Sequence, residues 1–140
     1  MTTNIATTKE QSARLLQCGV DPETADMYYQ VPITLSQKQR GEDILLLKRP
    51  GKTLYNIDTP VWSLSALLTL LPKEIYDESD DSFYFSLAKE FPLSEEYGAA
   101  YIPCWDKGDA IVRKRDNDPI EACVQLIEWL TANNYKLNQL

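Results

Sequence analysis

Hydrophobic residues at helical spacing mark the clearest element of the chain. The apolar positions on this one helical face are Ile120, Cys123, Val124, Ile127 and Leu130. Asp118 and Pro119 come directly before the run, and these residue types favour the N-cap and the first helical position. Because Asn133-Asn134 closes the run, the pattern predicts a helix that begins at Pro119 and ends before Asn133.

Two helices are expected near the start of the chain. Thr7 and Glu10 have the spacing of a capping box, and Gly19 stands where a glycine commonly ends a helix. Asp21-Pro22 repeats the start signal and predicts a second helix that stops before Pro32.

A third helix is expected over residues 61–71, because Asp58-Thr59-Pro60 is a start signal and Pro72 ends the run. Only Ser65 and Thr69 form a polar stripe on this helix. A helix that is apolar almost all round is buried, so we expect it to be the central helix of the fold.

Three strands are expected after this helix, at residues 82–87, 97–102 and 110–113. In the first, Phe83, Phe85 and Leu87 share one face. In the second, Gly98 is expected to allow a close approach. Successive strands joined by short turns, such as the turn-rich residues 106–109, imply an antiparallel meander.

Residues 44–57 have two interpretations. The apolar runs 44–49 and 53–57 flank Pro50-Gly51, the pair that a type II turn requires, and this predicts a hairpin. The leucine run also fits a helix. The polar residues 34–43 before it are expected to form an exposed loop.

The order of these elements predicts an α+β fold, with an antiparallel meander of about three strands plus the candidate hairpin. The meander is expected to pack against the buried central helix and the terminal helices. A length of 140 residues favours a single domain, placed at residues 8–140, after a flexible N-terminus at residues 1–7.

Composition excludes several classes of site. The chain has no histidine, which removes Ser-His-Asp and Cys-His catalysis and most zinc sites, so neither a metal nor another cofactor is expected. Cys18, Cys104 and Cys123 are an odd number at wide spacings, which argues against a disulfide framework, and the first and last of these are expected in the core. The start of the chain lacks signal-peptide features and no apolar run is long enough to span a bilayer, so a cytoplasmic location is expected.

The net charge of −7 is concentrated in one stretch. Residues 74–96 contain eight carboxylates and one lysine, which equals the whole excess. The densest part holds Glu74, Asp77, Glu78, Asp80 and Asp81. A calcium loop would need a turn glycine that is missing here, so the remaining interpretations are a solvated loop, a surface that steers a partner, and a mimic of DNA.

Phosphate and nucleic-acid motifs are weak. Gly51-Lys52-Thr53 resembles the end of a phosphate-binding loop, but Leu46 stands where the motif requires its first glycine. Arg113-Lys114-Arg115 is the only basic triplet, and acidic residues flank it. Direct binding of nucleic acid is therefore not expected.

Tyrosine and tryptophan side chains are the other candidates for a recognition surface, since they anchor many interfaces. The candidates are Tyr28, Tyr29, Trp62, Tyr97, Tyr101 and Trp105. Packing in the core or at its margin is the alternative for each, and Trp129 is assigned a structural role because it neighbours the apolar face of the last helix. Cys104 beside Trp105 is a candidate thiol nucleophile, but Lys107 is its one basic neighbour.

Three stretches together carry a resemblance to a known family. They are Thr24-Ala25-Asp26-Met27, Trp62-Ser63-Leu64-Ser65-Ala66-Leu67 within the run 60–72, and Asp118-Pro119-Ile120-Glu121-Ala122 leading into Trp129-Leu130. The set resembles a family of short uncharacterised proteins from gut Bacteroides genomes and their phage or conjugative elements. The resemblance implies an intracellular bacterial accessory protein carried on a mobile element.

The leading functional hypothesis is a non-enzymatic accessory protein that binds another macromolecule, with a protein as the expected partner. Its candidate binding residues are the acidic stretch and the aromatic residues named above. The alternatives are a small enzyme with a carboxylate and tyrosine site, and an acidic decoy of DNA. Oligomeric state has no signal in the sequence.

Overall fold

The computed structural model describes residues 5–30, 44–48, 58–90, 92, 94–104 and 108–139. Its helices are α1 (Lys9–Gln17), α3 (Leu64–Leu70) and α4 (Pro119–Ala132), with a 3-10 turn η1 at Pro22–Thr24. Its strands are β1 (Met27–Gln30), β2 (Ile44–Leu47), β3 (Thr59–Val61), β4 (Glu74–Tyr76), β5 (Ser82–Lys89), β6 (Tyr97–Pro103) and β7 (Val112–Asp116). The strands form two antiparallel sheets, which confirms an α+β fold.

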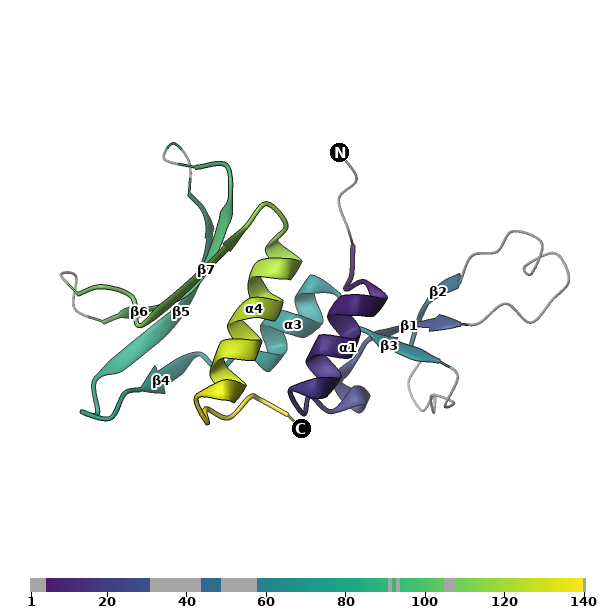
Figure 1. Cartoon of the computed structure of the whole chain (residues 1–140), viewed down its shortest axis with the longest axis horizontal. Helices are drawn as coiled ribbons and strands as arrows, with labels where there is room; N and C mark the ends of the chain where they lie inside the picture. The colour runs from purple at the N-terminus through teal and green to yellow at the C-terminus, as the bar shows by residue number, and fades with distance from the viewer. Residues whose placement is uncertain are drawn as a thin grey trace, which may run out of the picture.

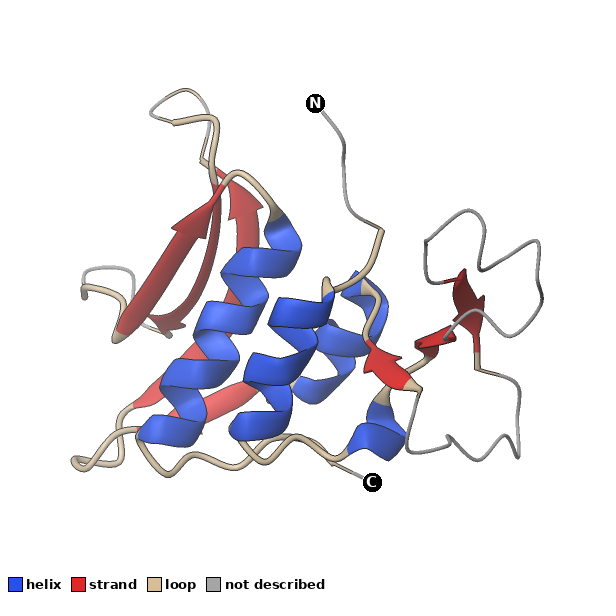
Figure 2. Cartoon of the chain, turned by 45° about the vertical axis from the view of Figure 1, so that its right-hand side comes forward, coloured by secondary structure: helices blue, strands red, loops and turns tan. Residues whose placement is uncertain are grey.

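The two sheets lie at opposite ends of the molecule with the helices between them (Figures 1 and 2). One sheet has the order β4-β5-β6-β7 and the other has the order β2-β1-β3. Helix α4 packs against β6 and β7 on one side and against α1 and α3 on the other, while α1 also contacts β3. Helix α4 is therefore the centre of the fold.

The four-stranded sheet is the expected meander, with one strand more than the pattern predicted. Strands β5, β6 and β7 correspond to the three expected strands, although β7 begins two residues later than predicted. The additional edge strand β4 lies within the acidic stretch that was interpreted as loop. It forms because Ile75, 4% exposed, faces the core opposite Phe83.

Helix α4 begins and ends where the sequence predicted. The side chain of Asp118 accepts a hydrogen bond from the backbone N–H of Ile120 at 2.9 Å, and Pro119 occupies the first turn. Seven residues of this helix are buried in the main core: Ile120, Ala122, Cys123, Val124, Leu126, Ile127 and Leu130. The periodic pattern was decisive because one whole face of this helix is buried.

A central buried helix was predicted at residues 61–71. The observed helix begins later, at Leu64, and it is not the central helix of the fold. The chain at Thr59–Val61 is strand β3, and α3 begins only after Ser63, whose hydroxyl accepts from the N–H of Ala66 at 3.2 Å. Leu67 and Leu70 are buried, but Leu68 is exposed with the predicted polar stripe. Helix α4, and not α3, is the one that covers the meander.

The N-terminal cap lies one residue later than predicted. Thr8 and Gln11 form the capping box, with hydrogen bonds of 3.2 Å and 2.9 Å. Thr7, which was expected in a flexible end, is fully buried, and its backbone N–H donates to the carbonyl of Trp62 at 2.9 Å. Gly19 follows α1 with a φ of 87°, the left-handed conformation that a terminal glycine readily adopts.

The second predicted helix is absent from the described chain, and strand β1 replaces it. Asp21 caps as expected, but only the single turn η1 follows. Met27 to Gln30 then pair with β2 on one side, and Met27 to Tyr29 pair with β3 on the other. Met27 is buried against Ala6 and Val61, so distant partners override the local start signal.

The predicted hairpin is supported only in its first arm. Ile44–Leu47 is strand β2, and its described partner is β1. Residues 49–57, which contain the predicted turn and second arm, lie outside the described residues, as do residues 34–43 of the expected loop.

The three cysteines occupy different environments. Cys123 is fully buried, as predicted, and burial raises the pKa of its thiol to about 12. Cys18 is half-buried against the main core, while Cys104 is exposed.

Candidate binding groove

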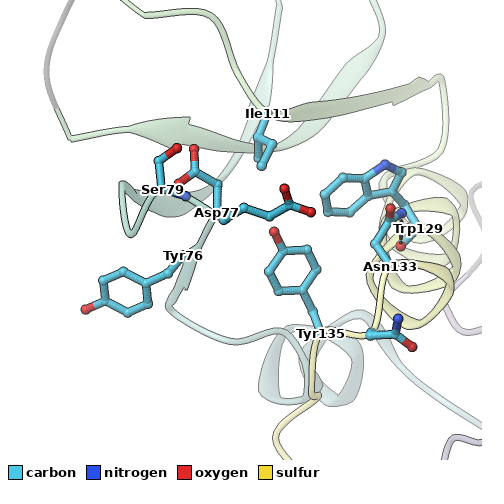
Figure 3. A pocket seen from close by; sticks show the side chains of 9 residues that line it. Tyr76, Asp77, Ser79, Ile111, Trp129, Asn133 and Tyr135 are labelled. Carbon is cyan, nitrogen blue, oxygen red and sulfur yellow. Dashed lines mark hydrogen bonds between the residues drawn. The ribbon is translucent and has the colours of Figure 1, made fainter.

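An open hollow of about 570 Å³ lies between the β4–β5 turn and the C-terminal end of α4 (Figure 3). Its lining residues are Tyr76, Asp77, Glu78, Ser79, Ile111, Trp129, Asn133, Asn134 and Tyr135. We call this hollow the groove. It has two unlike walls, because the turn supplies acidic side chains and the helix end supplies aromatic and amide side chains.

The aromatic wall is built by the way in which α4 ends. Asn134 has a φ of 65°, and the backbone N–H of Tyr135 donates to the carbonyl of Leu130 at 2.9 Å. The N–H of Asn134 donates to the carbonyl of Thr131 at 3.3 Å. These bonds form a Schellman motif, in which the residue after the left-handed position folds back on the last turn of the helix.

Folding back brings Tyr135 against Trp129. The two rings are stacked, with centroids 5.5 Å apart and an angle of 17° between their planes. Both side chains are half-buried, and both border the groove from the end of α4 (Figure 3). Packing and the helix end fix the two rings, so little conformational entropy remains to be lost on binding.

The acidic wall is a tight turn that one carboxylate organises. Asp77 accepts hydrogen bonds from the backbone N–H groups of Ser79 and Asp81, each at 2.9 Å. The backbone N–H of Asp77 donates to the carbonyl of Asp81 at 3.0 Å, and Asp80 adopts a φ of 62°. The carboxylate of Asp77 is therefore used by the turn itself.

The side chains of the other three acidic residues in the turn do not hold its backbone in place. Glu78, Asp80 and Asp81 are exposed. Across the described ranges, no hydrogen bond or ion pair holds their side chains. These three residues carry the charge of the turn that remains available to a ligand.

Most of the aromatic candidates from the sequence do not form a surface. Trp62 and Tyr101 are fully buried; the Trp62 indole N–H donates to the Thr24 hydroxyl at 2.9 Å, and the Tyr101 hydroxyl donates to the Pro72 carbonyl at 2.8 Å. Burial raises the pKa of Tyr101 above its ordinary value. These two are core residues.

The remaining aromatic candidates lie apart from the groove. Tyr28 is buried in β1, while Tyr29 is half-buried with Lys9 Nζ 6.0 Å from its ring centroid. Tyr97 is half-buried beside Lys89 at the far end of β6. Trp105 lies outside the described residues, so the predicted site at Cys104 and Trp105 is not placed.

A carboxylate and tyrosine cluster does exist, on the open face of the meander. Glu74 accepts a hydrogen bond from the Tyr76 hydroxyl, and Tyr84 lies opposite Glu74 on the neighbouring strand. The tyrosine hydroxyl groups lower the pKa of Glu74, while its carboxylate raises the pKa of Tyr76 and of Tyr84. The ring of Tyr76 points away from the groove (Figure 3).

Two of the three residues of the basic triplet pair with a single carboxylate. Glu90 binds Arg113 at 3.0 Å and Arg115 at 2.6 Å. Its carboxyl group lies directly over Gly98, at the place that a Cβ atom would fill. Gly98 thus provides the predicted close approach, and two of the three basic residues have a partner of opposite charge.

A second hollow, of about 390 Å³, lies between η1 and α3. Glu23, Thr24, Asp26, Ser65, Thr69 and Asn138 supply its polar lining. The carboxylate of Asp26 accepts hydrogen bonds from the backbone N–H and the hydroxyl of Ser63, and Glu23 binds Lys48 at 3.1 Å. Its charged groups are thus already paired.

Sequence reasoning missed the aromatic half of the groove. Trp129 was assigned to a structural role, and it does pack against the main core, but its position in the lining of the groove was not predicted, and Tyr135 was not considered. The signal was present, because Asn134 is a residue type that adopts the left-handed conformation, and an apolar contact across a Schellman motif commonly joins the positions that Tyr135 and Trp129 occupy.

No protein-family model, curated protein or solved structure matches the chain. Among the described residues, no three acidic or cysteine side chains are grouped to hold a metal ion. None of the helices in the described ranges has the length and the apolar character needed to cross a bilayer. The geometry of the groove is therefore the main guide to the function of the chain.

Proposed function

We propose that the chain is a non-enzymatic accessory protein that binds another protein through the groove. The stacked Trp129–Tyr135 pair opposite the acidic turn carries this proposal. Tryptophan and tyrosine dominate the energetics of many interfaces, since they combine a large apolar area with a polar group. Here they are held in place before any partner binds.

Binding is better supported than catalysis. An acid-base site needs groups whose pKa values are brought toward the working pH. In the cluster on the open sheet face, the pKa of Glu74 is lowered and those of Tyr76 and Tyr84 are raised, so each moves away from neutrality. The exposed hydrogen bonds of this cluster favour a role in holding β4 against β5.

The arrangement of the acidic side chains also favours a protein partner over the mimicry of DNA. A mimic needs carboxylates spread along one face, as duplex phosphates are, at about 1.7 Å of helix axis per charge. Glu78, Asp80 and Asp81 instead gather in a single turn. A turn of this kind fits a local contact at the edge of an interface.

The proposal includes a cellular context. The family resemblance supports an accessory protein of a bacterial mobile element that acts in the cytoplasm. The absence of histidine suits a role that needs no imidazole chemistry.

Site-specific photo-crosslinking in the cells that produce the protein tests the proposal. We expect a crosslinker in place of Ser79, which lines the groove, to give a product of discrete mass. A crosslinker in place of Ala13, which is exposed on α1, serves as the matched control. Tyr135→Leu should reduce the product at position 79 while the protein stays folded by circular dichroism.

The opposite pattern would overturn the proposal. A discrete product at position 13 and none at position 79 would place the interface on another face. A product at position 79 that Tyr135→Leu leaves unchanged would remove the aromatic wall from the binding site.

A further inference from the structure

We infer that the groove receives an arginine side chain from an exposed segment of the partner protein. This inference rests on the proposed function and names the chemistry that the groove would recognise. It follows from three observations: the charge of the lining, the stacked rings, and the hydrogen-bond acceptors between them.

The charge of the groove has one sign. Among the lining residues that the structure describes, the only charged side chains are Asp77 and Glu78, and none of those residues is a lysine or an arginine. Asp80 and Asp81 belong to the same turn and add to the negative potential. A cationic group is therefore drawn to this wall, and its association should weaken as salt increases.

The opposite wall suits a flat cation. Guanidinium is planar and stacks on aromatic faces, and tryptophan is the best such partner. Trp129 and Tyr135 are fixed by their own stacking and by packing against the main core, so a guanidinium group would stack on the outer part of a ring that lines the groove. A compact ammonium group gains less from such a wall because it cannot stack in a plane.

The acceptors of the groove match the many donors of arginine. Glu78 is exposed, and its carboxylate can accept a forked pair of hydrogen bonds. Asn133 donates its side-chain N–H to the carbonyl of Trp129 at 2.8 Å, which leaves its amide oxygen as an acceptor on the same wall. Arginine offers five N–H donors and no acceptor, so it is complementary to this lining.

The size of the groove fits a side chain with some adjoining backbone. Its volume of about 570 Å³ falls within the range of about 300–1,000 Å³ that ligand pockets occupy. The groove is open and the turn that borders it is exposed, so a segment on a protein surface can enter without a large rearrangement.

Calorimetric titration of the full chain with synthetic peptides tests the inference. The probe is a short Gly/Ser peptide that carries two arginines, and the matched peptide carries citrulline, which keeps the shape and removes the charge. We expect the citrulline peptide to bind about tenfold more weakly, because the cation–π and ionic contacts are lost together. A lysine peptide should bind more weakly than the arginine peptide.

Variants of the protein locate the site. Glu78→Gln should weaken binding of the arginine peptide about threefold to tenfold, since it removes one charge from a hydrogen-bonded pair. Glu95→Gln, an exposed change in the β5–β6 hairpin, is the matched control and should leave binding unchanged. Trp129→Leu and Tyr135→Leu should each weaken binding, and thermal unfolding verifies that both variants fold.

The outcomes separate the two proposals. If the arginine and citrulline peptides bind equally, or if Glu78→Gln and Glu95→Gln behave alike, the arginine inference is wrong. The proposed function still stands in that case provided that the crosslinked product at position 79 persists. If that product is missing, the proposed function is wrong whatever the peptides do.

Discussion

Arg14 Nη1 donates to Glu121 Oε1 at 2.7 Å and so joins the first helix to the last. The same guanidinium group contacts Glu128, about two helical turns further along α4. Gln11 and Gln125 also donate to Glu121, which completes a polar network between α1 and α4. This network fixes α1 on the face of α4 that is turned away from the meander.

Replacing Arg14 should loosen this helix pair. We expect Arg14→Gln to lower the free energy of unfolding by about 1–2 kcal/mol, because charge-assisted hydrogen bonds are lost while solvent screens part of the effect. Urea unfolding measures the change. Arg115→Gln, on the more exposed ion pair with Glu90, is the comparison and should cost less; an equal or larger cost would contradict the assignment.

The same pair predicts a loss of stability in acid. Burial tends to raise the pKa of Glu121, but hydrogen bonds from Arg14, Gln11 and Gln125 lower it below its ordinary value. A carboxyl group with a lowered pKa in the folded state stabilises the protein fully above its unfolded pKa of about 4.3. That contribution disappears as the pH falls through the lower folded pKa.

Urea midpoints measured from neutral pH down into the acid range test this dependence. Wild type should lose stability more steeply than Arg14→Gln, in which the pKa of Glu121 has lost its main cause of lowering. Parallel curves for the two proteins would show that this pair does not set the acid response.

The turn that forms the acidic wall should depend on one of its carboxylates. Asp77→Ala removes the acceptor of two backbone N–H groups, so we expect a loss of about 1–2 kcal/mol in thermal or urea unfolding. Asp77→Asn keeps an acceptor oxygen and should cost less. Glu78→Ala should fall within about 0.5 kcal/mol of wild type; a similar loss there would mean that the whole turn is structural.

The end of α4 should be sensitive to the residue at position 134. Asn134→Gly keeps the left-handed conformation and should be neutral or slightly stabilising, whereas Asn134→Val should cost at least about 1–2 kcal/mol because a branched side chain disfavours a positive φ. The near-ultraviolet circular dichroism of the Trp129–Tyr135 pair should weaken in the valine variant alone. An unchanged spectrum would show that the stack forms without the Schellman motif.

The sequence predicted those elements that bury residues at regular intervals or that begin with a capping residue of their own. Helix α4 shows both, since Asp118 caps it and one face supplies the core. The sequence also predicted which face of strand β5 is buried: Phe83 and the two apolar residues that alternate with it pack against the core. In each case the information lies within one short segment.

Strands that form only by pairing with distant segments could not be predicted from their own sequence. Strand β1 follows a good helix start at Asp21, yet its partners begin at Ile44 and Thr59. Strand β4 was not predicted because it lies in an acidic stretch and has a single buried residue, Ile75, to indicate a strand. Neither pairing leaves a periodic pattern in its own sequence.

The sequence predicted only the acidic wall of the candidate site. The acidic turn was visible in the charge distribution, but its wall of Trp129 and Tyr135 depends on how α4 ends and on which element that end faces. Trp62 and Tyr101 were indistinguishable from surface candidates in the sequence, because aromatic residues serve the core and interfaces equally well.

In the β4–β5 turn, one acidic side chain holds the backbone in shape and the others contribute negative charge. Asp77 determines the path of the backbone, while Glu78, Asp80 and Asp81 leave their side chains in solvent. Substitutions at Glu78 and Asp81 can therefore change the charge beside the groove without refolding the hairpin, whereas Asp80 has a left-handed backbone conformation that few residue types adopt readily. The aromatic wall comes from a different element, the end of α4, so changes in the charge of the turn leave it in place.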